Sequence, residues 1–430
     1  MAGGTVHIIG AGLAGLSAAV ACVGSGREVV LHELARHAGG RCRSYFEPAL
    51  GLTIDNGNHL LLSANDNALS FLKTIGSEGK LAGPDEAEFA FADLASDERW
   101  VFHPNEGLVP WWIFAKDRRV PGTGPLDYLS MTRLLFPGKD ERIDKVIDCS
   151  GAVYERLSRP IFLAALNTEP REASAVLASA ILRKTLARGG QACHPLIASD
   201  GLGPAFIDPA LAYLEHNGAK LCFTHQLRGV YVAAGNAALL DFGDDKVELD
   251  PGDSVILAVP AAVARILLGD IDAPSTFRAI INAHFKIAPP QDFPRLLGIV
   301  NGTAEWLFSY PDRISATISA ADRFVETDRG ELAQAIWSDV AKLTGAKGDM
   351  PQWHIVKERR ATFAALPEEN AKRPGAETQF ANLFLAGDWT ATGLPATIEG
   401  AILSGKTAAN ALLAKGRRGL NGSGAKGSSP

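Results

Sequence analysis

The fold of this chain is decided by its first stretch, Thr5-Val-His-Ile-Ile-Gly-Ala-Gly-Leu-Ala-Gly15. Residues 5–9 form a short apolar run rich in β-branched side chains, which is typical of a buried strand. Three glycines spaced Gly-x-Gly-x-x-Gly follow without a gap and lead into the small, apolar helix formers of 16–24. Residues 28–32 indicate a second strand that ends at Glu33. Strand, glycine turn, helix, strand and acid in this order predict a βαβ unit that binds a dinucleotide.

Each part of this unit has a physical reason. Gly10 permits a tight turn, Gly12 lets the backbone approach a pyrophosphate, and Gly15 lets the helix pack close to the strand. The unpaired N–H groups at the start of the helix point toward the phosphates, and Glu33 can accept hydrogen bonds from the adenosine ribose. The residues expected to contact the cofactor here are Gly10, Ala11, Gly12, Leu13, Ala14, Gly15 and Glu33. The turn alone does not separate FAD from NAD.

The same glycine spacing recurs in the tail, at Gly422-Ser-Gly-Ala-Lys-Gly427, where no strand precedes it and no helix follows. That second match therefore carries no prediction. Residues 415–430 are rich in Gly, Ser, Lys and Arg, and this composition predicts a disordered tail.

Length and composition further limit the number of domains, the binding partners and the cellular location to expect. A chain of 430 residues exceeds what one core usually supports, so two domains are expected. The net charge of −6 gives no electrostatic case for nucleic acid. The five cysteines are widely spaced and form no Cys-x-x-Cys pair, so we expect neither disulfides nor a metal. No signal peptide and no spanning apolar run is present, which favours the cytoplasm and leaves room for peripheral contact with the inner face of the cytoplasmic membrane.

Residues 34–62 contain further groups suited to binding the cofactor. Gly39 and Gly40 allow the backbone to approach a second phosphate, which Arg41 can neutralise. Asp55-Asn-Gly-Asn-His-Leu-Leu-Leu62 suits a loop that runs along a cofactor before a helix starts. The residues expected to line the cofactor here are Gly40, Arg41, Gly57, Asn58, His59 and Leu60. His59 is either a catalytic group or a satisfied buried histidine.

From about residue 82 the composition becomes aromatic. Residues 88–102 predict a hairpin, and helical patterns follow at 125–136, 142–165 and 172–188. Trp111, Trp112 and Phe114, with Tyr154 and Phe162, could line a hydrophobic channel or a mouth that faces a membrane. The alternative for each of these residues is ordinary core packing.

Residues 220–259 predict short strands in a β-meander that returns to a buried core strand, with Leu227 placed where its backbone could meet an adenine edge. Strands at 296–301, 305–310 and 314–319 and a helix at 328–343 would build the substrate domain. Near the end, a buried strand precedes Gly387 and Asp388, whose carboxylate could bind a polyol hydroxyl. A helix start at Pro395, Ala396, Thr397 and Ile398 could place positive potential beside a reduced ring.

Four separated elements, Gly10 to Gly15, Glu33, Gly39-Gly-Arg41 and Gly387-Asp388, resemble the FAD-dependent amine oxidase and phytoene desaturase superfamily along nearly the whole chain. The resemblance implies FAD as cofactor, with Glu33 on the ribose, Arg41 on a phosphate, Asp388 on the ribityl chain and Leu227 on adenine. It implies an α/β fold: a Rossmann-like FAD-binding domain with a β-meander (1–82, 216–290, 375–414) and an inserted α+β substrate domain (83–215, 291–374).

Three longer motifs are similar to the squalene-associated branch, the hydroxysqualene dehydroxylases of hopanoid biosynthesis. They are residues 55–62, Arg159-Pro-Ile-Phe-Leu-Ala-Ala-Leu-Asn-Thr-Glu-Pro-Arg-Glu-Ala-Ser174, and Leu385-Ala-Gly-Asp-Trp-Thr-Ala-Thr-Gly-Leu-Pro-Ala-Thr-Ile-Glu-Gly400. The resemblance implies that a C30 isoprenoid alcohol, hydroxysqualene, is the substrate. Hydride would pass from reduced FAD N5 to an allylic carbon as water leaves.

The proton donor for that reaction is open among His59, Glu399 and Tyr154, and the electron donor is open between NAD(P)H and a redox protein. Two alternatives have the same fold: a carotenoid or phytoene-type desaturase, and an amine oxidase, which would need an aromatic cage to which Trp389 could contribute. A non-enzymatic prenyl-lipid carrier is a third alternative, but it predicts a degraded cofactor site.

Overall fold

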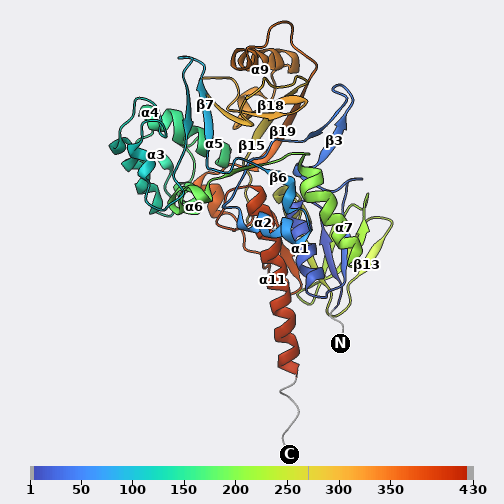
Figure 1. The fold of residues 1–430 in the computed structure, drawn as a ribbon. Helices are drawn as coiled ribbons and strands as arrows, with labels where there is room; N and C mark the ends of the chain where they lie inside the picture. Colours follow the sequence, from blue (N-terminus) through green and yellow to red (C-terminus); the bar gives the residue numbers. More distant parts are fainter. Residues whose placement is uncertain (1–3, 270, 424–430) are drawn as a thin grey trace, which may run out of the picture.

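The computed structural model describes residues 4–269 and 271–423, which form five β-sheets with helices packed on their faces (Figure 1). Two of these sheets organise the molecule. The first is a five-stranded parallel sheet with strands from the N-terminal and the C-terminal parts of the chain. The second is a seven-stranded mixed sheet, which lies above the first in Figure 1.

The parallel sheet confirms the predicted βαβ unit and adds the returning strands. Its order is β10-β2-β1-β14-β20, and all four pairings are parallel. The strands are β1 (Val6–Ile9), β2 (Val29–His32), β10 (Lys220–Cys222), β14 (Ser254–Leu257) and β20 (Leu383–Leu385). Parallel strands need crossover connections, so segments from the two ends of the sequence meet at the carboxyl edge of this sheet.

The alternating side chains of this sheet pack against different layers. One face is covered by α1 (Leu13–Gly24), α7 (Asp208–His216) and α11 (Ile398–Ser423), with Ile8 and Phe384 among its buried residues. The other face is covered by the meander and α8 (Ala261–Leu268), with Ile9 and Leu257 in that core. The meander strands are β11 (Gly229–Ala233), β12 (Asn236–Asp241) and β13 (Lys246–Glu248).

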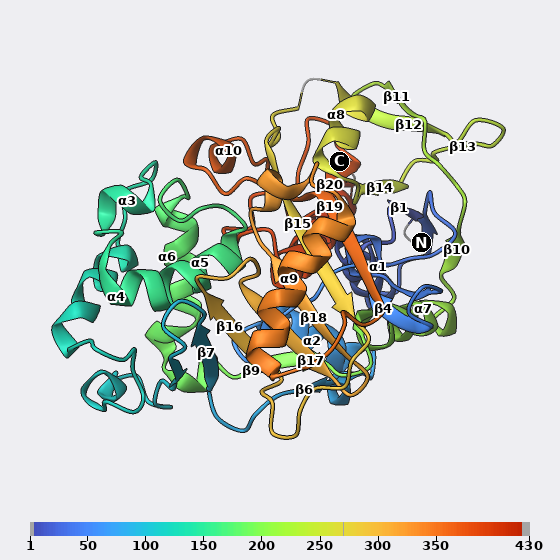
Figure 2. The same ribbon diagram turned by 90° about the horizontal axis from the view of Figure 1, so that it is seen from above.

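The seven-stranded sheet has the order β19-β15-β18-β17-β16-β7-β8. Its strands are β7 (Phe89–Asp93), β8 (Arg99–Phe102), β15 (Phe277–Phe285), β16 (Leu296–Val300), β17 (Trp306–Tyr310), β18 (Arg313–Ile318) and β19 (Trp353–Phe363). Helix α9 (Arg329–Thr344) lies across one face and buries it (Figure 2). The other face carries the polar side chains Asn282 and Thr317 together with aromatic rings, and it packs toward the cofactor-binding segments.

The predicted helical insert is more broken than its pattern suggests. Its elements are η3 (Trp111–Phe114), η4 (Pro125–Leu135), α3 (Ile143–Val146), α4 (Gly151–Val153), the π-helical η5 (Tyr154–Ser158), α5 (Arg159–Leu166), α6 (Ala175–Lys184), η6 (Leu186–Arg188) and η7 (Gly190–Ala192). Pro160 lies in the first turn of α5, which continues directly from the π-helical turn η5.

The remaining elements are short. They are β3 (Ser44–Glu47), β4 (Leu52–Asp55), β5 (Leu61–Leu62), α2 (Asp66–Thr74), η2 (Glu78–Lys80), β6 (Leu81–Ala82), β9 (Pro195–Ala198), η8 (Gly203–Ile207), η9 (Ala321–Phe324) and α10 (Pro367–Ala371). Strand β9 pairs with both β5 and β6, which ties the end of the insert back to the N-terminal segment.

Two predicted domain boundaries move. Strand β15 pairs with β18 and β19, so residues 277–285 belong to the seven-stranded sheet and not to the cofactor domain. Helix α7 packs on α1, so the end of the predicted 83–215 segment belongs to the cofactor domain. Both shifts have one cause, because each segment follows the layer that buries its apolar side chains.

Helix α11 continues to Ser423, into the segment 415–430 that was expected to be disordered, and it projects from the body of the molecule (Figure 1). Residues 424–430 lie outside the described part of the chain, and with them most of the second glycine match. No helix among the described residues is long and apolar enough to cross a bilayer.

Candidate functional site

The three glycines of the first turn meet three different surroundings. A Cβ on Gly15 would lie 1.8 Å from the carbonyl oxygen of Gly10, and Gly10 itself has a φ of +105°. Both positions therefore need glycine for the fold. A Cβ on Gly12 would meet no described atom within 4 Å. No described side chain caps the start of α1 at Gly12, so its first-turn N–H groups point into this open space and fit a pyrophosphate.

Glu33 stands at the end of β2, next to this turn. Its Oε2 accepts a hydrogen bond from the Ala11 N–H at 2.7 Å, and its Oε1 accepts one from the Ala35 N–H at 2.9 Å. Two backbone donors thus fix the carboxylate beside the glycine turn. Each oxygen keeps a lone pair, which fits the two hydroxyls of a ribose.

The second glycine pair joins the first. The Gly39 N–H donates to the Ala11 oxygen at 2.8 Å, and Gly12 and Gly39 form a parallel β-bridge. A Cβ on Gly40 would lie 3.5 Å from the Cα of Gly12. Two glycine segments predicted separately therefore line one backbone cradle.

Arg41 leaves this cradle toward the far end of the chain. Its guanidinium lies 2.9 Å from Oδ1 of Asp388 and also donates to the Ala361 oxygen. The Asp388 carboxylate raises the pKa of Arg41, so the guanidinium stays charged. Asp388 follows β20, at the carboxyl edge of the parallel sheet. A cationic group for a phosphate and an acceptor for a polyol chain thus lie side by side, which fits FAD.

Trp389 does not form an aromatic cage. Its indole N–H donates to the Val259 oxygen at 2.9 Å, and its ring is packed in the core beneath Gly387. Arg373 donates to the carbonyl oxygens of Asp388 and Thr390, which fixes the loop. Trp389 therefore packs against the turn that carries Asp388 and helps to fix the conformation of that turn.

The segment 55–60 runs between the two main sheets. Asn58 donates from Nδ2 to Oγ1 of Thr317 at 3.0 Å, and its backbone N–H donates to Oδ1 of Asn282 at 3.3 Å. A Cβ on Gly57 would meet Nδ2 of Asn282 at 3.2 Å and Nε2 of His59 at 3.8 Å. Sequence reasoning missed Asn282 and Thr317, although polar residues that alternate with apolar ones in 277–285 and in 314–319 were a usable signal.

His59 lies close enough to Arg41 to respond to its charge. Burial, and then the positive charge of Arg41, lower the pKa of His59 to about 4. The imidazole is therefore neutral near pH 7. The half-buried Leu60 packs against the aromatic core of the substrate domain.

Glu399 is held by donors from two neighbouring helices. Its carboxylate accepts hydrogen bonds from the Ala68 N–H at 2.9 Å and from Asn67 at 2.8 Å and 3.3 Å, and Lys184 lies 3.1 Å from Oε1. It closes the N-terminus of α2 from a neighbouring helix. In all of these contacts the Glu399 carboxylate is the acceptor, so its role in the structure is to hold the start of α2 and Lys184.

Tyr154 is 3% exposed, and its hydroxyl has no hydrogen-bond partner among the described residues. Burial is the main cause that raises the pKa of Tyr154, so its O–H keeps its proton. It stands at the start of the π-helical turn η5, and such turns often mark functional sites.

The remaining predicted cofactor residues fall near these groups in sequence. Leu227 is buried under the meander between β10 and β11. Helix α11 starts at Ile398, three residues later than Pro395, because Oγ1 of Thr397 accepts the Gly400 N–H at 3.1 Å and caps it. Pro395 and Ala396 form the turn before that cap.

The three predicted channel residues split into two groups. Trp112 is 8% exposed and packs edge-on against Phe102 and Tyr128. Trp111 and Phe114 are 66% and 62% exposed, and their rings lie 6.1 Å apart. Trp112 thus belongs to the interior, whereas Trp111 and Phe114 face outward and do not line an internal channel.

Trp112 is part of an aromatic cluster on the inner side of the seven-stranded sheet. The cluster consists of Phe89, Phe91, Trp100, Phe102, Trp112, Tyr128, Trp306, Phe308 and Tyr310. Leu60, Leu62 and Ile113 pack against its edges. The cluster therefore reaches from the segment beside His59 to the turn that carries Trp111.

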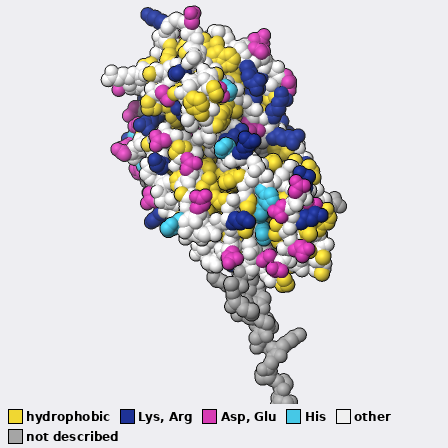
Figure 3. Space-filling view, turned by 90° about the vertical axis from the view of Figure 1, so that its right-hand side faces the viewer, with side chains coloured by type: hydrophobic (Ala, Val, Ile, Leu, Met, Phe, Trp, Pro, Cys, Tyr) yellow, Lys and Arg dark blue, Asp and Glu magenta, His cyan; other side chains and the backbone are white. Residues whose placement is uncertain are grey.

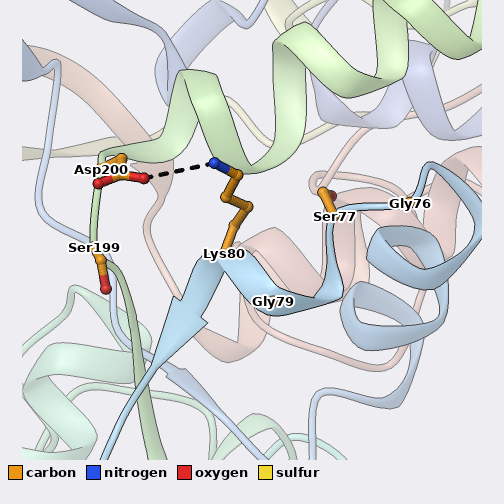
Figure 4. Close-up of a pocket in the computed structure, with 6 residues that line it drawn as sticks. All are labelled: Gly76, Ser77, Gly79, Lys80, Ser199 and Asp200. Carbon is orange, nitrogen blue, oxygen red and sulfur yellow. Dashed lines mark ion pairs between the residues drawn. The ribbon is translucent and has the colours of Figure 1, made fainter.

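A pocket of about 320 Å³ lies elsewhere, between η2 and the loop after β9. Its lining residues are Gly76, Ser77, Gly79, Lys80, Ser199 and Asp200, and Lys80 points toward Asp200 at 3.6 Å (Figure 4). None of the predicted cofactor or catalytic residues lines it.

Comparison with known proteins agrees with this geometry. The family model described as flavin containing amine oxidoreductase matches residues 13–413. The hydroxysqualene dehydroxylase of Sinorhizobium fredii is 50% identical over 410 residues, covering 95% of this chain and 98% of that protein. The hydroxysqualene dehydroxylase of Rhodopseudomonas palustris is 50% identical over 414 residues, covering 96% and 99%.

Among solved structures, cyclohexylamine oxidase from Brevibacterium oxydans superposes with a TM-score of 0.68 at 16% identity, covering 97% of this chain and all of that one, which supports the fold. The chain is an FAD-dependent oxidoreductase, with FAD as its cofactor. It belongs to the flavin containing amine oxidoreductase family, on the branch that includes the hydroxysqualene dehydroxylases.

Proposed function

We propose that this chain reductively removes the hydroxyl group of hydroxysqualene to give squalene, as a step toward hopanoids. Relatives of that name at 50% identity, aligned over nearly their whole length, support the proposal. The structural observation that carries it is the meeting of the glycine cradle and Glu33 with Arg41 and Asp388, which fits the FAD that this reaction needs.

The cofactor would be held by three charged groups of this chain. Glu33 would bind the ribose, Arg41 a phosphate and Asp388 the ribityl chain, while Gly12 and Gly40 let the backbone approach the pyrophosphate. Reduced FAD supplies the hydride that replaces the hydroxyl on the allylic carbon. The balance is one alcohol and one reduced flavin giving one alkene, one water and one oxidised flavin.

The chain must also protonate the departing hydroxyl and tolerate an allylic cation. An aromatic face in contact with a desolvated cation stabilises it by about 2 kcal/mol. His59 is the catalytic candidate whose pKa responds to the charge of Arg41. With a pKa of about 4 the imidazole is neutral, so it would orient the hydroxyl group of the substrate by donating a hydrogen bond to it.

The variants His59→Gln and His59→Ala separate these roles. We expect Gln to keep part of the turnover, because its amide can still donate a hydrogen bond, and Ala to lose about 100-fold or more. Tyr154→Phe removes the other hydroxyl candidate. If His59→Ala turns over normally at full flavin content and Tyr154→Phe does not, the role passes to Tyr154.

Anaerobic turnover of photoreduced enzyme tests the reaction itself. We expect one squalene for each flavin reoxidised when hydroxysqualene is added. Squalene without flavin reoxidation would overturn the proposal. Reduction of oxidised flavin by phytoene or by simple amines, with no reaction of hydroxysqualene, would instead favour the desaturase or the amine oxidase. The electron donor is proposed to be NAD(P)H or a redox protein, distinguished by which of them reduces the bound flavin.

We further propose that the insert rests on an anionic membrane surface, from which the enzyme takes its apolar substrate. Seven apolar residues around η3 and η4 are 53% to 83% exposed: Leu108, Val109, Trp111, Phe114, Leu126, Leu129 and Phe136. We name this set the exposed apolar patch. Exposed Lys116, Arg133 and Lys139 lie in the same segments, and tryptophan beside lysine and arginine suits an anionic lipid interface.

Co-sedimentation with vesicles checks this contact. We expect Trp111→Ala with Phe114→Ala to reduce binding to vesicles containing phosphatidylglycerol by about 10-fold or more. Phe46→Ala is the control, because Phe46 is 62% exposed on β3, outside the patch. Equal losses in both variants, or binding that ignores the anionic lipid, would contradict the proposal.

A further inference from the structure

Three residues capable of binding a metal meet where two strands of the parallel sheet end. Cys222 of β10 is the direct cross-strand partner of His32 of β2, so their side chains lie on the same face. His225 follows three residues later and brings its Nδ1 to 2.9 Å from Nδ1 of His32. One potential ligand atom from each residue lies within 4.8 Å of the other two.

The surroundings of these two imidazoles are those of ligand histidines. The outer nitrogen of His32, Nε2, lies 3.2 Å from Nδ1 of His7, and that of His225 lies 3.4 Å from Oδ2 of Asp245. Metal-binding histidines regularly give their second nitrogen such a partner, which fixes tautomer and orientation. Phe242 stacks on His225 at 3.8 Å between ring centroids and on His32 at 4.6 Å, which holds both rings in place.

We propose that His32, Cys222 and His225 bind one Zn²⁺ ion, with the fourth position open to water. Two imidazoles and a thiolate select a borderline divalent cation over Mg²⁺ or Ca²⁺. Binding replaces the hydrogen bond between His32 and His225 and releases the thiol proton of Cys222. Tetrahedral coordination spaces two nitrogens about 3.3 Å apart. The rings must therefore separate by a few tenths of an ångström, which His225, in the loop between β10 and β11, can accommodate.

The site lies behind the ribose end of the cofactor site and takes no part in the redox chemistry. The Glu33 N–H donates to the Cys222 oxygen at 2.8 Å, and the His225 N–H donates to the Glu33 oxygen at 2.8 Å. A bound ion would therefore brace the loop that holds the backbone of Glu33. Figure 3 views the side that carries β3 and β13, where histidine side chains reach the surface. Cys222 is partly exposed, so an ion has a path to the site.

Other parts of the molecule offer a matched control. Glu86, Glu88 and His103 form a second cluster, in which His103 contacts Glu86 at 2.7 Å and Glu88 at 3.7 Å. Both nitrogens of His103 face the carboxylates, and the cluster holds no thiol. Cys193 is a buried cysteine far from His32 in the fold.

The test uses the flavin-loaded protein, stripped of metal with a chelator and titrated with ZnCl₂. We expect one Zn²⁺ per chain and a zinc-edge X-ray absorption spectrum with one sulfur near 2.3 Å and nitrogens near 2.0 Å. Cys222→Ser and His225→Gln should each weaken binding by about 10-fold or more, whereas His103→Gln and Cys193→Ser should not. Far-ultraviolet circular dichroism and flavin content show that each variant is folded.

Three results would overturn the site. They are the absence of stoichiometric Zn²⁺, a spectrum without sulfur, and binding lost through His103→Gln but kept in Cys222→Ser. None of them bears on the reaction of hydroxysqualene, because the flavin site and the zinc site are read out separately.

Discussion

The guanidinium of Arg41 lies 2.9 Å from Oδ1 of Asp388, although 347 positions separate the two residues in sequence. This pair closes the cofactor site from both ends of the chain, because Arg41 follows the glycine cradle and Asp388 follows the last strand of the parallel sheet. The two groups hold each other where a phosphate and a polyol chain would meet them.

Removing either member should release FAD. For Arg41→Met and Asp388→Asn we expect FAD to dissociate about 10- to 100-fold more readily, since hydrogen bonds to charged groups contribute about 1.5 to 3 kcal/mol. The measurement is the ratio of flavin to protein absorbance after dialysis. Arg359→Met is the control, because Arg359 pairs with Glu326 on the surface. Full flavin retention in both site variants would contradict this assignment.

Substitution of Gly12 should affect FAD binding, whereas substitution of Gly15 should affect the stability of the apoprotein. A Cβ at Gly12 meets no described atom, so Gly12→Ala should leave the apoprotein as stable as the wild type but weaken FAD binding. A Cβ at Gly15 lies 1.8 Å from the Gly10 oxygen, so Gly15→Ala should lower the melting temperature of the apoprotein itself. Thermal unfolding with and without FAD separates the two. If the Gly12→Ala apoprotein were destabilised, Gly12 would be needed for folding and not only for the approach of a pyrophosphate.

Glu399 should act on stability and not on chemistry. Glu399→Ala leaves Lys184, Asn67 and the Ala68 N–H without their acceptor, which costs about 2 to 5 kcal/mol and lowers the melting temperature. Turnover per bound flavin should stay within a few-fold of the wild type. A loss of 100-fold or more in turnover at an unchanged melting temperature would restore Glu399 as the proton donor.

One half of the cofactor site could be predicted from the sequence, because the roles of its residues depend on neighbours in the chain. The glycine turn, Glu33, Gly40 and Arg41 have roles set by neighbours a few residues away, and the structure brings them into one cradle. Asp388 was assigned to the cofactor as well, but its contact with Arg41 depends on a crossover that no local pattern encodes.

The rest depended on tertiary placement. Residues 277–285 alternate apolar and polar side chains, yet they were assigned to the wrong domain, because a strand's pattern does not say which sheet it joins. Trp111 and Trp112 are neighbours in one 3-10 turn, and their rotation about that turn decides that one is exposed and the other buried. The partners of Glu399 come from α2 and α6, and its position in the sequence does not reveal them.

Glu305 gives a pH dependence that sequence did not anticipate. It precedes β17, its Oε2 accepts the Ser319 N–H at 2.8 Å, and Arg323 lies 3.6 Å from Oε1. Burial raises the pKa of Glu305 to about 7, against the opposing effects of the Ser319 hydrogen bond and the arginine. In the unfolded chain the carboxyl group releases its proton near pH 4.5. Between these values folding takes up a proton, so the contribution of Glu305 to stability is complete below pH 4.5 and is lost as the pH rises through 7.

The neutral variant Glu305→Gln should therefore remove a penalty that exists only at higher pH. At pH 8 we expect it to be more stable than the wild type by up to about 3 kcal/mol, and at pH 4.5 to be equal or slightly less stable. Melting temperatures at the two pH values check this, with the exposed Glu248→Gln as the control. Because the expected difference changes with pH, an equal shift at both values would mean that Glu305 is ionised in the folded protein and that Arg323 compensates for its burial.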